Sequence, residues 1–308
     1  MFRKEKKIIL ATICLFILMS FYSQYLIVPV ISDETTTMAN AAGGVGYDWS
    51  WMIAALGGYY YRFGQALLTL PFFALFDDPD MIYRFSMILQ SAIQASIVPV
   101  IYGICRRHLR LQSQKLAIFL GITVCLVPSM VLYTFYYRGD FLLGILPWYV
   151  LLFFLEAVKA AQEKRKARRV LFTMLIALFS IFCYTAHTRG IIVIIALILA
   201  AVMIRTLERK KSLDWIAFFV AGGIFFLIDM QTGNVLKSAL YSLGGLNANA
   251  IESTDVGAYF SIFSFAAIKD LIMLCLSWLQ TLIASAQDRK STRLNSSHEI
   301  PSRMPSSA

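Results

Sequence analysis

Long apolar blocks alternate with short polar segments along this chain, and most of the blocks have the length of a membrane span. A helix that crosses a bilayer needs about 20 predominantly apolar residues, within a range of about 17–25. The pattern therefore predicts an all-α polytopic membrane protein with about eight transmembrane helices, the last one truncated. The expected spans are Ile8–Ile31, Met81–Cys105, Leu116–Tyr137, Phe141–Val158, Val170–Thr188, Gly190–Ile204, Trp215–Met230 and Leu271–Gln287.

The apolar segment Phe63–Phe76 has only 14 residues, which favours an interfacial or re-entrant helix over a span. If it does not cross, the basic segments 1–7, 106–115, 159–169 and 205–211 share one side and hold 18 Lys and Arg residues, against six on the other side. Cytoplasmic loops of membrane proteins are enriched in Lys and Arg. We therefore predict a cytoplasmic N-terminus, with Phe63–Phe76 on the outer face of a bacterial cytoplasmic membrane.

The composition is typical of a membrane protein and does not indicate a nucleic-acid partner, a metal or a cofactor. The chain is 58% hydrophobic and 15% charged, with a mean hydropathy of +0.67; average soluble proteins are less apolar and more highly charged. The net charge of +10 follows from basic cytoplasmic loops, so no nucleic-acid partner is expected. The five cysteines lie in apolar blocks and predict neither disulfides nor a metal site. No glycine-rich phosphate loop is present, so a nucleotide donor and other cofactors are not expected.

Residues 288–308, DRKSTRLNSSHEIPSRMPSSA, change abruptly from apolar to polar sequence in what reads as a helix. The segment resembles the translation of a sequencing-adapter oligonucleotide. We expect it to be artefactual and disordered, because it lacks apolar residues with which to pack. The remaining residues 1–287 are then predicted to form one transmembrane domain that is truncated at its C-terminus.

Two carboxylates, Asp33 and Glu34, follow the first apolar block directly and are predicted on the outer side. Ser32 is a suitable N-cap for a short helix through Met38, and acidic residues stabilise a first helical turn. A capped interfacial helix is therefore one interpretation. The other is catalytic, because a carboxylate at the water–lipid boundary can take a proton from an acceptor that attacks a lipid-linked donor.

Further candidate site residues share the predicted outer side with these carboxylates. Four arginines depart from the positive-inside trend and suit a donor phosphate, whereas Asp140 is a second acidic group or an arginine partner. His187 lies beside one of the arginines, and a lone histidine is more often structural than a ligand. The candidate substrate-binding residues are Arg62, Arg84, Arg138, Asp140, His187 and Arg189.

The order of these features resembles the GT-C superfamily of membrane glycosyltransferases, which includes protein O-mannosyltransferases and the lipid A aminoarabinose transferase. The resemblance lies in Asp33-Glu34 at the end of the first helix, in YYYRFGQALLTLPFFALFDDPDMIYRFSMILQSA, in the basic RRHLRLQSQK and in CYTAHTRGIIVIIA. The family's Pro-Pro is replaced here by Phe63-Gly64-Gln65. The resemblance implies a GT-C-like domain in which Asp33, and second Glu34, matches the catalytic base.

The leading hypothesis is accordingly a glycosyltransferase that moves a sugar from a polyprenyl-phosphate donor to an outward-facing acceptor. Its expected partners are the lipid-linked donor and membrane lipids. The rival hypothesis is a multi-pass transporter or flippase for a lipid-linked or small polar solute. Transporters place ionisable residues near the middle of the membrane and often contain repeated halves, whereas the acidic residues here are predicted at the outer boundary. Asp229 is also assigned to that boundary.

Overall fold

A computed structural model describes residues 2–25, 32–51, 63–128, 130–131, 136–137, 139–207 and 212–244, with the single residues Lys269, Met273 and Ser277. The side chains of residues 2–5, 32–36, 139 and 188 are outside this description. The chain divides into units 1–251 and 252–308, and the account below concerns the first unit. The predicted tail 288–308, and the predicted span Leu271–Gln287 apart from Met273 and Ser277, lie outside the described residues.

Every secondary-structure element in the described part of the chain is a helix, which confirms the predicted all-α class. Five helical stretches there are long and apolar enough to cross a membrane. They are formed by α1 (Phe2–Tyr25), by the succession of α5 (Pro79–Ala95), α6 (Ile97–Gly103) and the π-helical turn η1 (Ile104–His108), by α9 (Gly139–Gln162), by α10 (Lys166–Ala186) and by α12 (Trp215–Leu243).

Four further helices are shorter, and they leave the predicted number of about eight spans unconfirmed. They are α2 (Ser32–Gly44), α4 (Gly64–Leu75), α7 (Gln114–Cys125) and α11 (Ile191–Leu207). At a rise of about 1.5 Å per residue, the 12 residues of α4 measure about 18 Å, well under the thickness of the apolar layer. In the predicted span Leu116–Tyr137, α7 ends at Cys125, shortly before Pro128, and residues 129 and 132–135 lie outside the described part of the chain.

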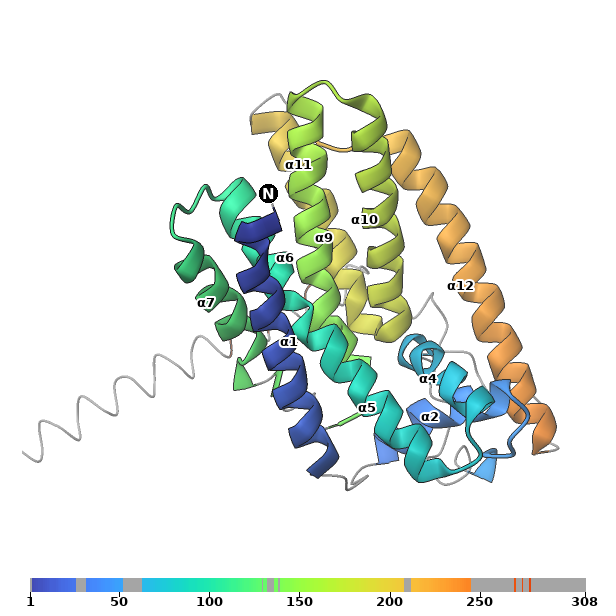
Figure 1. Ribbon diagram of the computed structural model, residues 1–308. Helices are drawn as coiled ribbons and strands as arrows, with labels where there is room; N and C mark the ends of the chain where they lie inside the picture. Colours follow the sequence, from blue (N-terminus) through green and yellow to red (C-terminus); the bar gives the residue numbers. More distant parts are fainter. Residues whose placement is uncertain are drawn as a thin grey trace, which may run out of the picture. The chain divides into compact units, whose positions relative to one another are not determined.

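The long helices α9 and α10 form an antiparallel pair at the centre of the first unit (Figure 1). A tight turn joins them, in which Lys164 adopts a positive φ of 56°. Phe154 and Ala157 of α9 pack with Ile176 and Ala177 of α10, and α11 and α12 contribute to the same apolar cluster. The α9–α10 pair therefore packs against both α11 and α12 through this cluster.

The helices α2, α4 and α5 gather near the end of α12 that lies farthest from the α9–α10 turn (Figure 1). Their apolar side chains, among them Met38, Phe73 and Met87, form a common cluster with Leu236 of α12. Small residues allow α2 to approach α12 closely: a Cβ on Gly43 would lie 2.9 Å from the Cβ of Leu240. Such close contact between backbones is typical of helix packing in membranes.

Polar side chains also join helices inside the bundle. Gln65 of α4 donates to Gln90 of α5 over 2.9 Å, and the hydroxyl of Tyr137 donates to the Gln65 carbonyl over 2.6 Å. Gln94 in turn donates to the Cys125 carbonyl at 2.9 Å. Because water is scarce in a bilayer, such internal partners satisfy groups that would otherwise be costly to bury.

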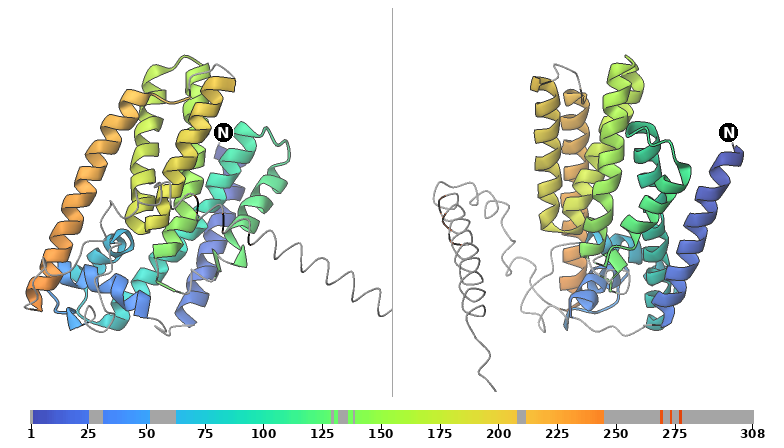
Figure 2. Two further views of the ribbon diagram at one scale, coloured as in Figure 1. Left: turned by 180° about the vertical axis from the view of Figure 1, so that it is seen from behind. Right: turned by 90° about the vertical axis from the view of Figure 1, so that its left-hand side faces the viewer.

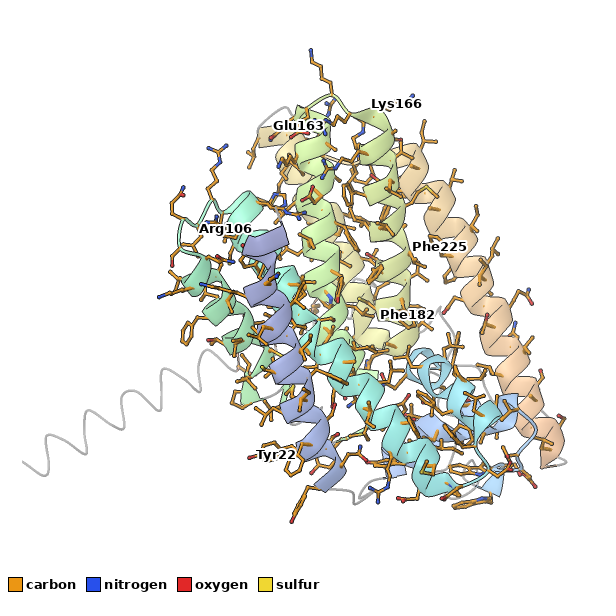
Figure 3. All side chains as sticks on the ribbon, in the orientation of Figure 1. Tyr22, Arg106, Glu163, Lys166, Phe182 and Phe225 are labelled. Atoms are coloured by element: carbon orange, nitrogen blue, oxygen red, sulfur yellow. The ribbon has the colours of Figure 1, made fainter. Side chains whose placement is uncertain are left out.

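The connections rich in Lys and Arg lie together at one end of the first unit (Figures 1 and 2). The start of α1, the η1–α7 connection, the α9–α10 turn, the end of α11 and the start of α12 are all found there. Figure 3 shows Arg106, Glu163 and Lys166 near this end and Tyr22 near the other. This basic end is the predicted cytoplasmic end, and α2 and α4 lie toward the opposite end.

Candidate functional site

Three of the predicted site residues come together where α9 begins and α10 ends. His187 Nε2 lies 3.6 Å from Asp140 Oδ1, and an Arg189 guanidinium nitrogen lies 4.0 Å from the same oxygen. The side chains of Asp140 and His187 are 25% and 19% exposed, whereas that of Arg189 is 71% exposed. A carboxylate, an imidazole and an accessible cation thus form one cluster, which we call the Asp140 cluster.

Local structure explains why residues 47 positions apart meet. Asp140 occupies the first turn of α9, where a carboxylate interacts favourably with the helix dipole. His187 ends α10 with extended backbone, and a 3₁₀ turn, Thr188–Gly190, follows it. Gly190 is required there, because a Cβ would lie 2.3 Å from the Cys183 carbonyl. The antiparallel packing of α9 and α10 then brings the start of one helix to the end of the other.

The imidazole of His187 has a defined orientation within the cluster. Its Nδ1 accepts a hydrogen bond from the Arg189 backbone N–H over 3.1 Å. In the neutral ring the proton therefore resides on Nε2, the nitrogen that faces Asp140. The cluster consequently presents two donors, the His187 Nε2–H and the Arg189 guanidinium, beside one carboxylate, and both donors suit an anionic oxygen.

The other predicted residues are placed only in part. Asp33 and Glu34 lie in the first turn of α2, but their side chains are outside the described residues, as are Arg62 and Arg138 entirely. Arg84 forms an ion pair at 2.7 Å with Asp80, four residues earlier on α5. This exposed ion pair uses the Nε–H of Arg84. The other N–H groups of the guanidinium are not used by Asp80, so the pair does not contradict the predicted role of Arg84 in binding a phosphate.

A second group of polar contacts surrounds the start of α5. The hydroxyl of Tyr47 donates to Asp77 at 2.7 Å, and this hydrogen bond to a carboxylate raises the pKa of Tyr47. Hydrogen bonds from the Ser50 side chain and backbone lower the pKa of Asp48. Asp78 caps α5 by accepting from the Asp80 N–H at 2.9 Å. These three aspartates, which were not among the predicted site residues, therefore have structural partners.

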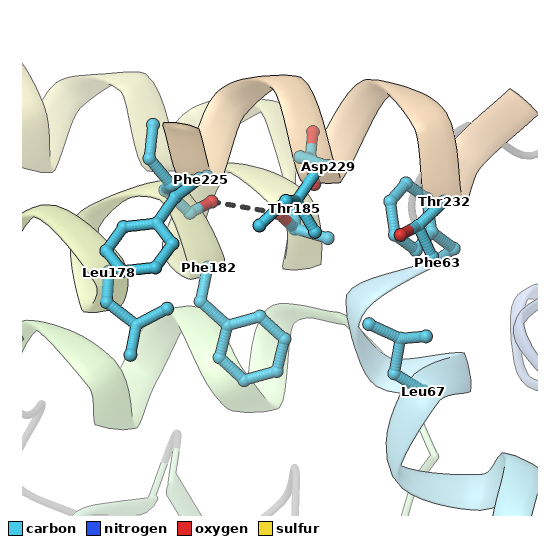
Figure 4. Close-up of a pocket in the computed structure, with 10 residues that line it drawn as sticks. Phe63, Leu67, Leu178, Phe182, Thr185, Phe225, Asp229 and Thr232 are labelled. Carbon is cyan, nitrogen blue, oxygen red and sulfur yellow. Dashed lines mark hydrogen bonds between the residues drawn. The ribbon is translucent and has the colours of Figure 1, made fainter. Parts of the chain in front are cut away.

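The helix that contains Asp229 is longer than predicted. The predicted helix ended at Met230, which put Asp229 at the membrane boundary, whereas α12 continues to Leu243 and Asp229 lies at its midpoint. The side chain accepts a hydrogen bond from Thr185 of α10. Both residues line a cavity of about 150 Å³ between α10, α12 and the residues at the start of α4 (Figure 4).

A buried ionic cluster at the basic end was also not predicted. Glu156 of α9 is 2% exposed, and its oxygens lie 2.7 Å from Arg168, 3.5 Å from Arg107 and 3.3 Å from Nε2 of His108. The signal was available, because Glu156 is the one acidic residue within the apolar run 141–158. Buried carboxylates require such partners, and this cluster joins α9, α10 and η1.

No protein-family model matches the chain, and no curated protein or solved structure is significantly similar to it. The class of the protein therefore follows from its own helices rather than from a relative. Five apolar helices of spanning length in the described residues indicate a helical, polytopic membrane protein. Among those residues, no group of three or more His, Cys, Asp or Glu side chains is arranged to hold a metal ion.

Proposed function

We propose that the protein is a glycosyltransferase that moves a sugar from a polyprenyl-phosphate donor to an acceptor on the outer face of a bacterial cytoplasmic membrane. The observation that carries the proposal is the Asp140 cluster. It combines an exposed guanidinium with an imidazole N–H, and both are donors suited to a lipid phosphate. The resemblance of the sequence to the GT-C superfamily supplies the reaction class.

The reaction requires a base, an electrophilic carbon and a stabilised leaving group. The acceptor hydroxyl or amine attacks the anomeric carbon of the donor sugar, and the bond from that carbon to the phosphate oxygen breaks. Asp33 takes the proton that the acceptor loses, with Glu34 as the second candidate. The departing polyprenyl phosphate carries the bonding electron pair, and Arg189 and His187 stabilise its negative charge.

The remaining predicted residues take supporting roles in this proposal. Asp140 positions the two donors, because its carboxylate lies within 4.0 Å of both side chains. Arg62, Arg84 and Arg138 are further candidates for the phosphate, and the fit of Arg84 requires that it bind with the N–H groups not used by Asp80.

The proposed topology completes the five long apolar helices with three more spans. Two of these additional spans are the segments that contain α7 and α11, and residues 271–287 are the third. Because the basic connections gather at one end, this topology places the Asp140 cluster on the outer side.

A kinetic experiment on purified protein in proteoliposomes tests the role of the cluster. Sugar transfer from a radiolabelled polyprenyl-phosphate sugar is measured against donor concentration for the wild type and Arg189→Gln. We expect the KM for the donor to rise about tenfold or more, as for loss of a hydrogen bond to a charged group. Lys164→Gln, at the basic end of the bundle, is the control. An unchanged donor KM in Arg189→Gln would remove Arg189 from the phosphate site.

One observation favours the rival function, a flippase or transporter. Asp229 lies at the middle of α12, and ionisable residues at such depth are characteristic of transport pathways. A dithionite-quenching assay with a fluorescent lipid-linked sugar in proteoliposomes tests this function. A transporter would show protein-dependent flipping that Asp229→Asn slows at least tenfold, together with no sugar transfer by the wild type.

A further inference from the structure

The cavity beside Asp229 is lined mainly by apolar side chains, although it contains a carboxylate. Seven of its ten lining side chains are apolar, and three of these are the phenylalanines Phe63, Phe182 and Phe225 (Figure 4). Its polar side chains are Asp229 and two threonines, Thr185 and Thr232. The cavity therefore surrounds one carboxylate with aromatic and aliphatic groups.

Size limits what this cavity can hold. Its volume of about 150 Å³ is close to that of an engineered cavity that accommodates benzene. Sites for drug-sized ligands are larger, about 300–1,000 Å³. A complete sugar with its phosphate therefore does not fit, whereas a headgroup of a few heavy atoms does. The cavity is thus a different site from the one proposed for sugar transfer.

The chemistry of the lining selects a cation. A carboxylate accepts about four hydrogen bonds, and the Thr185 hydroxyl supplies one of those that Asp229 receives. Aromatic rings attract a positively charged group over their faces, and cages of such rings bind alkylammonium ions. A carboxylate next to three phenylalanines consequently offers both kinds of attraction to an ammonium group.

Access to the cavity is through the apolar surface of the protein. Two of the lining residues, Leu178 of α10 and Ile228 of α12, are 38% and 56% exposed. In a helix that spans a bilayer, such side chains face the acyl chains. A ligand that enters here must therefore be soluble in the membrane, which requires an apolar chain attached to the charged group.

We propose that the Asp229 cavity binds the ammonium group of an amphiphilic amine that reaches it from the bilayer. The ammonium group pairs with the Asp229 carboxylate between the rings of Phe182 and Phe225, and the alkyl chain extends along the exposed side chains of α10 and α12. This site is independent of the proposed sugar transfer, since it uses none of the residues assigned to that reaction.

Equilibrium binding to the purified full chain in nonionic maltoside micelles tests the proposal. The probe is radiolabelled octyltrimethylammonium, measured against empty micelles, and its neutral counterpart carries a tert-butyl group in place of the trimethylammonium. We expect saturable binding of the cation at one site per chain and at least about tenfold weaker binding of the neutral compound. Asp229→Asn should weaken cation binding at least about tenfold, as for loss of a buried charge partner.

Two further variants separate the aromatic contribution from general effects. Phe182→Leu removes one ring and should weaken cation binding about threefold or more. Phe219→Leu is its matched control on the lipid-exposed face of α12, where Phe219 is 64% exposed and outside the cavity, and should bind as the wild type does. Equal binding of the charged and neutral compounds would overturn the proposal. So would wild-type affinity in Asp229→Asn with an unchanged thermal unfolding midpoint.

Discussion

At the scale of single residues, the Asp140 cluster joins the first turn of α9 to the end of α10. Asp140, His187 and Arg189 were predicted on one side of the membrane, and the structure brings all three within 4.0 Å contacts. Their sequence positions sufficed, because each lies at the end of an apolar block. The predicted helix end at Met230 was wrong, because residues 231–234 are polar or glycine while the helix continues to Leu243. The end of an apolar run marks the end of a helix only where capping or breaking residues coincide with it.

Glu156 is expected to be the most sensitive carboxylate at the basic end. Replacement by alanine leaves Arg168 and His108 without their buried partner, which should destabilise the fold by about 2–3 kcal/mol, somewhat below the usual effect of breaking a fully buried pair because Arg168 reaches solvent. Glu163→Ala is the matched control, since its pair with Arg165 is exposed and worth less than about 0.5 kcal/mol. Thermal unfolding followed by a thiol-reactive dye on the buried Cys105, Cys125 and Cys183 measures both effects. Equal midpoints for the two variants would contradict the assignment.

Asp214 should give the ion pair with Arg169 a defined pH dependence. The hydrogen bond from Arg169, at 2.8 Å, lowers the pKa of Asp214 below its ordinary value. A carboxyl with a lowered folded-state pKa stabilises the fold above its unfolded pKa of about 3.9, and this stabilisation is lost as the pH falls through the folded pKa. Asp214→Asn preserves an N-cap residue but removes the charge, so it should cost about 1 kcal/mol at pH 7.

The difference between Asp214→Asn and the wild type should then shrink below about pH 4. Circular dichroism at 222 nm, recorded during thermal unfolding at several pH values, provides the measurement. A difference that stays constant from pH 7 to pH 3 would show that the charge of Asp214 contributes nothing.

At the scale of elements, apolar block lengths predicted most helices but not their ends. The spans placed in α5–η1, α9 and α10 agree with the structure to within a few residues, and the first span overlaps α1 over residues 8–25, whereas its remaining residues 26–31 lie outside the described part of the chain. The helix expected from Ser32 to Met38 instead continues to Gly44. Gly43 and Gly44 fit against Leu240 and Leu236 of α12, and Gly46, with φ of +95°, follows the end of α2. Tertiary contact thus overrides a local preference that sequence alone displays.

The contact between α2 and α12 gives a paired glycine experiment. In Gly43→Ala the new methyl group would lie 2.9–3.0 Å from the Leu240 side chain and backbone, so overpacking should destabilise the fold by about 1–3 kcal/mol. Gly222→Ala in α12 meets nothing within 4 Å and should be neutral or slightly stabilising. Both midpoints are obtained by thermal unfolding in the same detergent. A neutral Gly43→Ala would show that α2 does not approach α12 closely.

At the scale of the whole molecule, the basic segments of the described structure lie together at one end of the first unit, as the charge distribution in the sequence predicts. Five helices in the described residues meet the length criterion for a span, and the predicted number of about eight stays unconfirmed. The early end of α7 had a local signal in Pro128 that the apolar block length masked. The contacts of α4 with α2 and α5 could not be predicted, because they depend on packing among helices distant in the chain. The candidate site was predicted as a set of residues, and its geometry required the α9–α10 pairing.

Cysteine labelling tests which side of the membrane this basic end faces. Asp78→Cys and Gln112→Cys are introduced in a Cys14→Ser background, because Cys14 is the exposed cysteine among the described ones. A membrane-impermeant maleimide should label position 78 in intact cells, and position 112 only after permeabilisation. Labelling of both positions from the same side would overturn the proposed topology.

The central claim is that the chain transfers a sugar from a polyprenyl phosphate with Asp33 as the base. Its most direct test is the release of polyprenyl phosphate from a labelled donor by wild type and Asp33→Asn in proteoliposomes. Glu34→Gln is measured beside them, because Glu34 is the second candidate for the base. We predict transfer by the wild type, a loss of more than about a hundredfold in Asp33→Asn, as for a missing general base, and unchanged membrane insertion. Near-normal release by Asp33→Asn would contradict the role of that residue, and no release by the wild type from any polyprenyl-phosphate sugar would contradict the function.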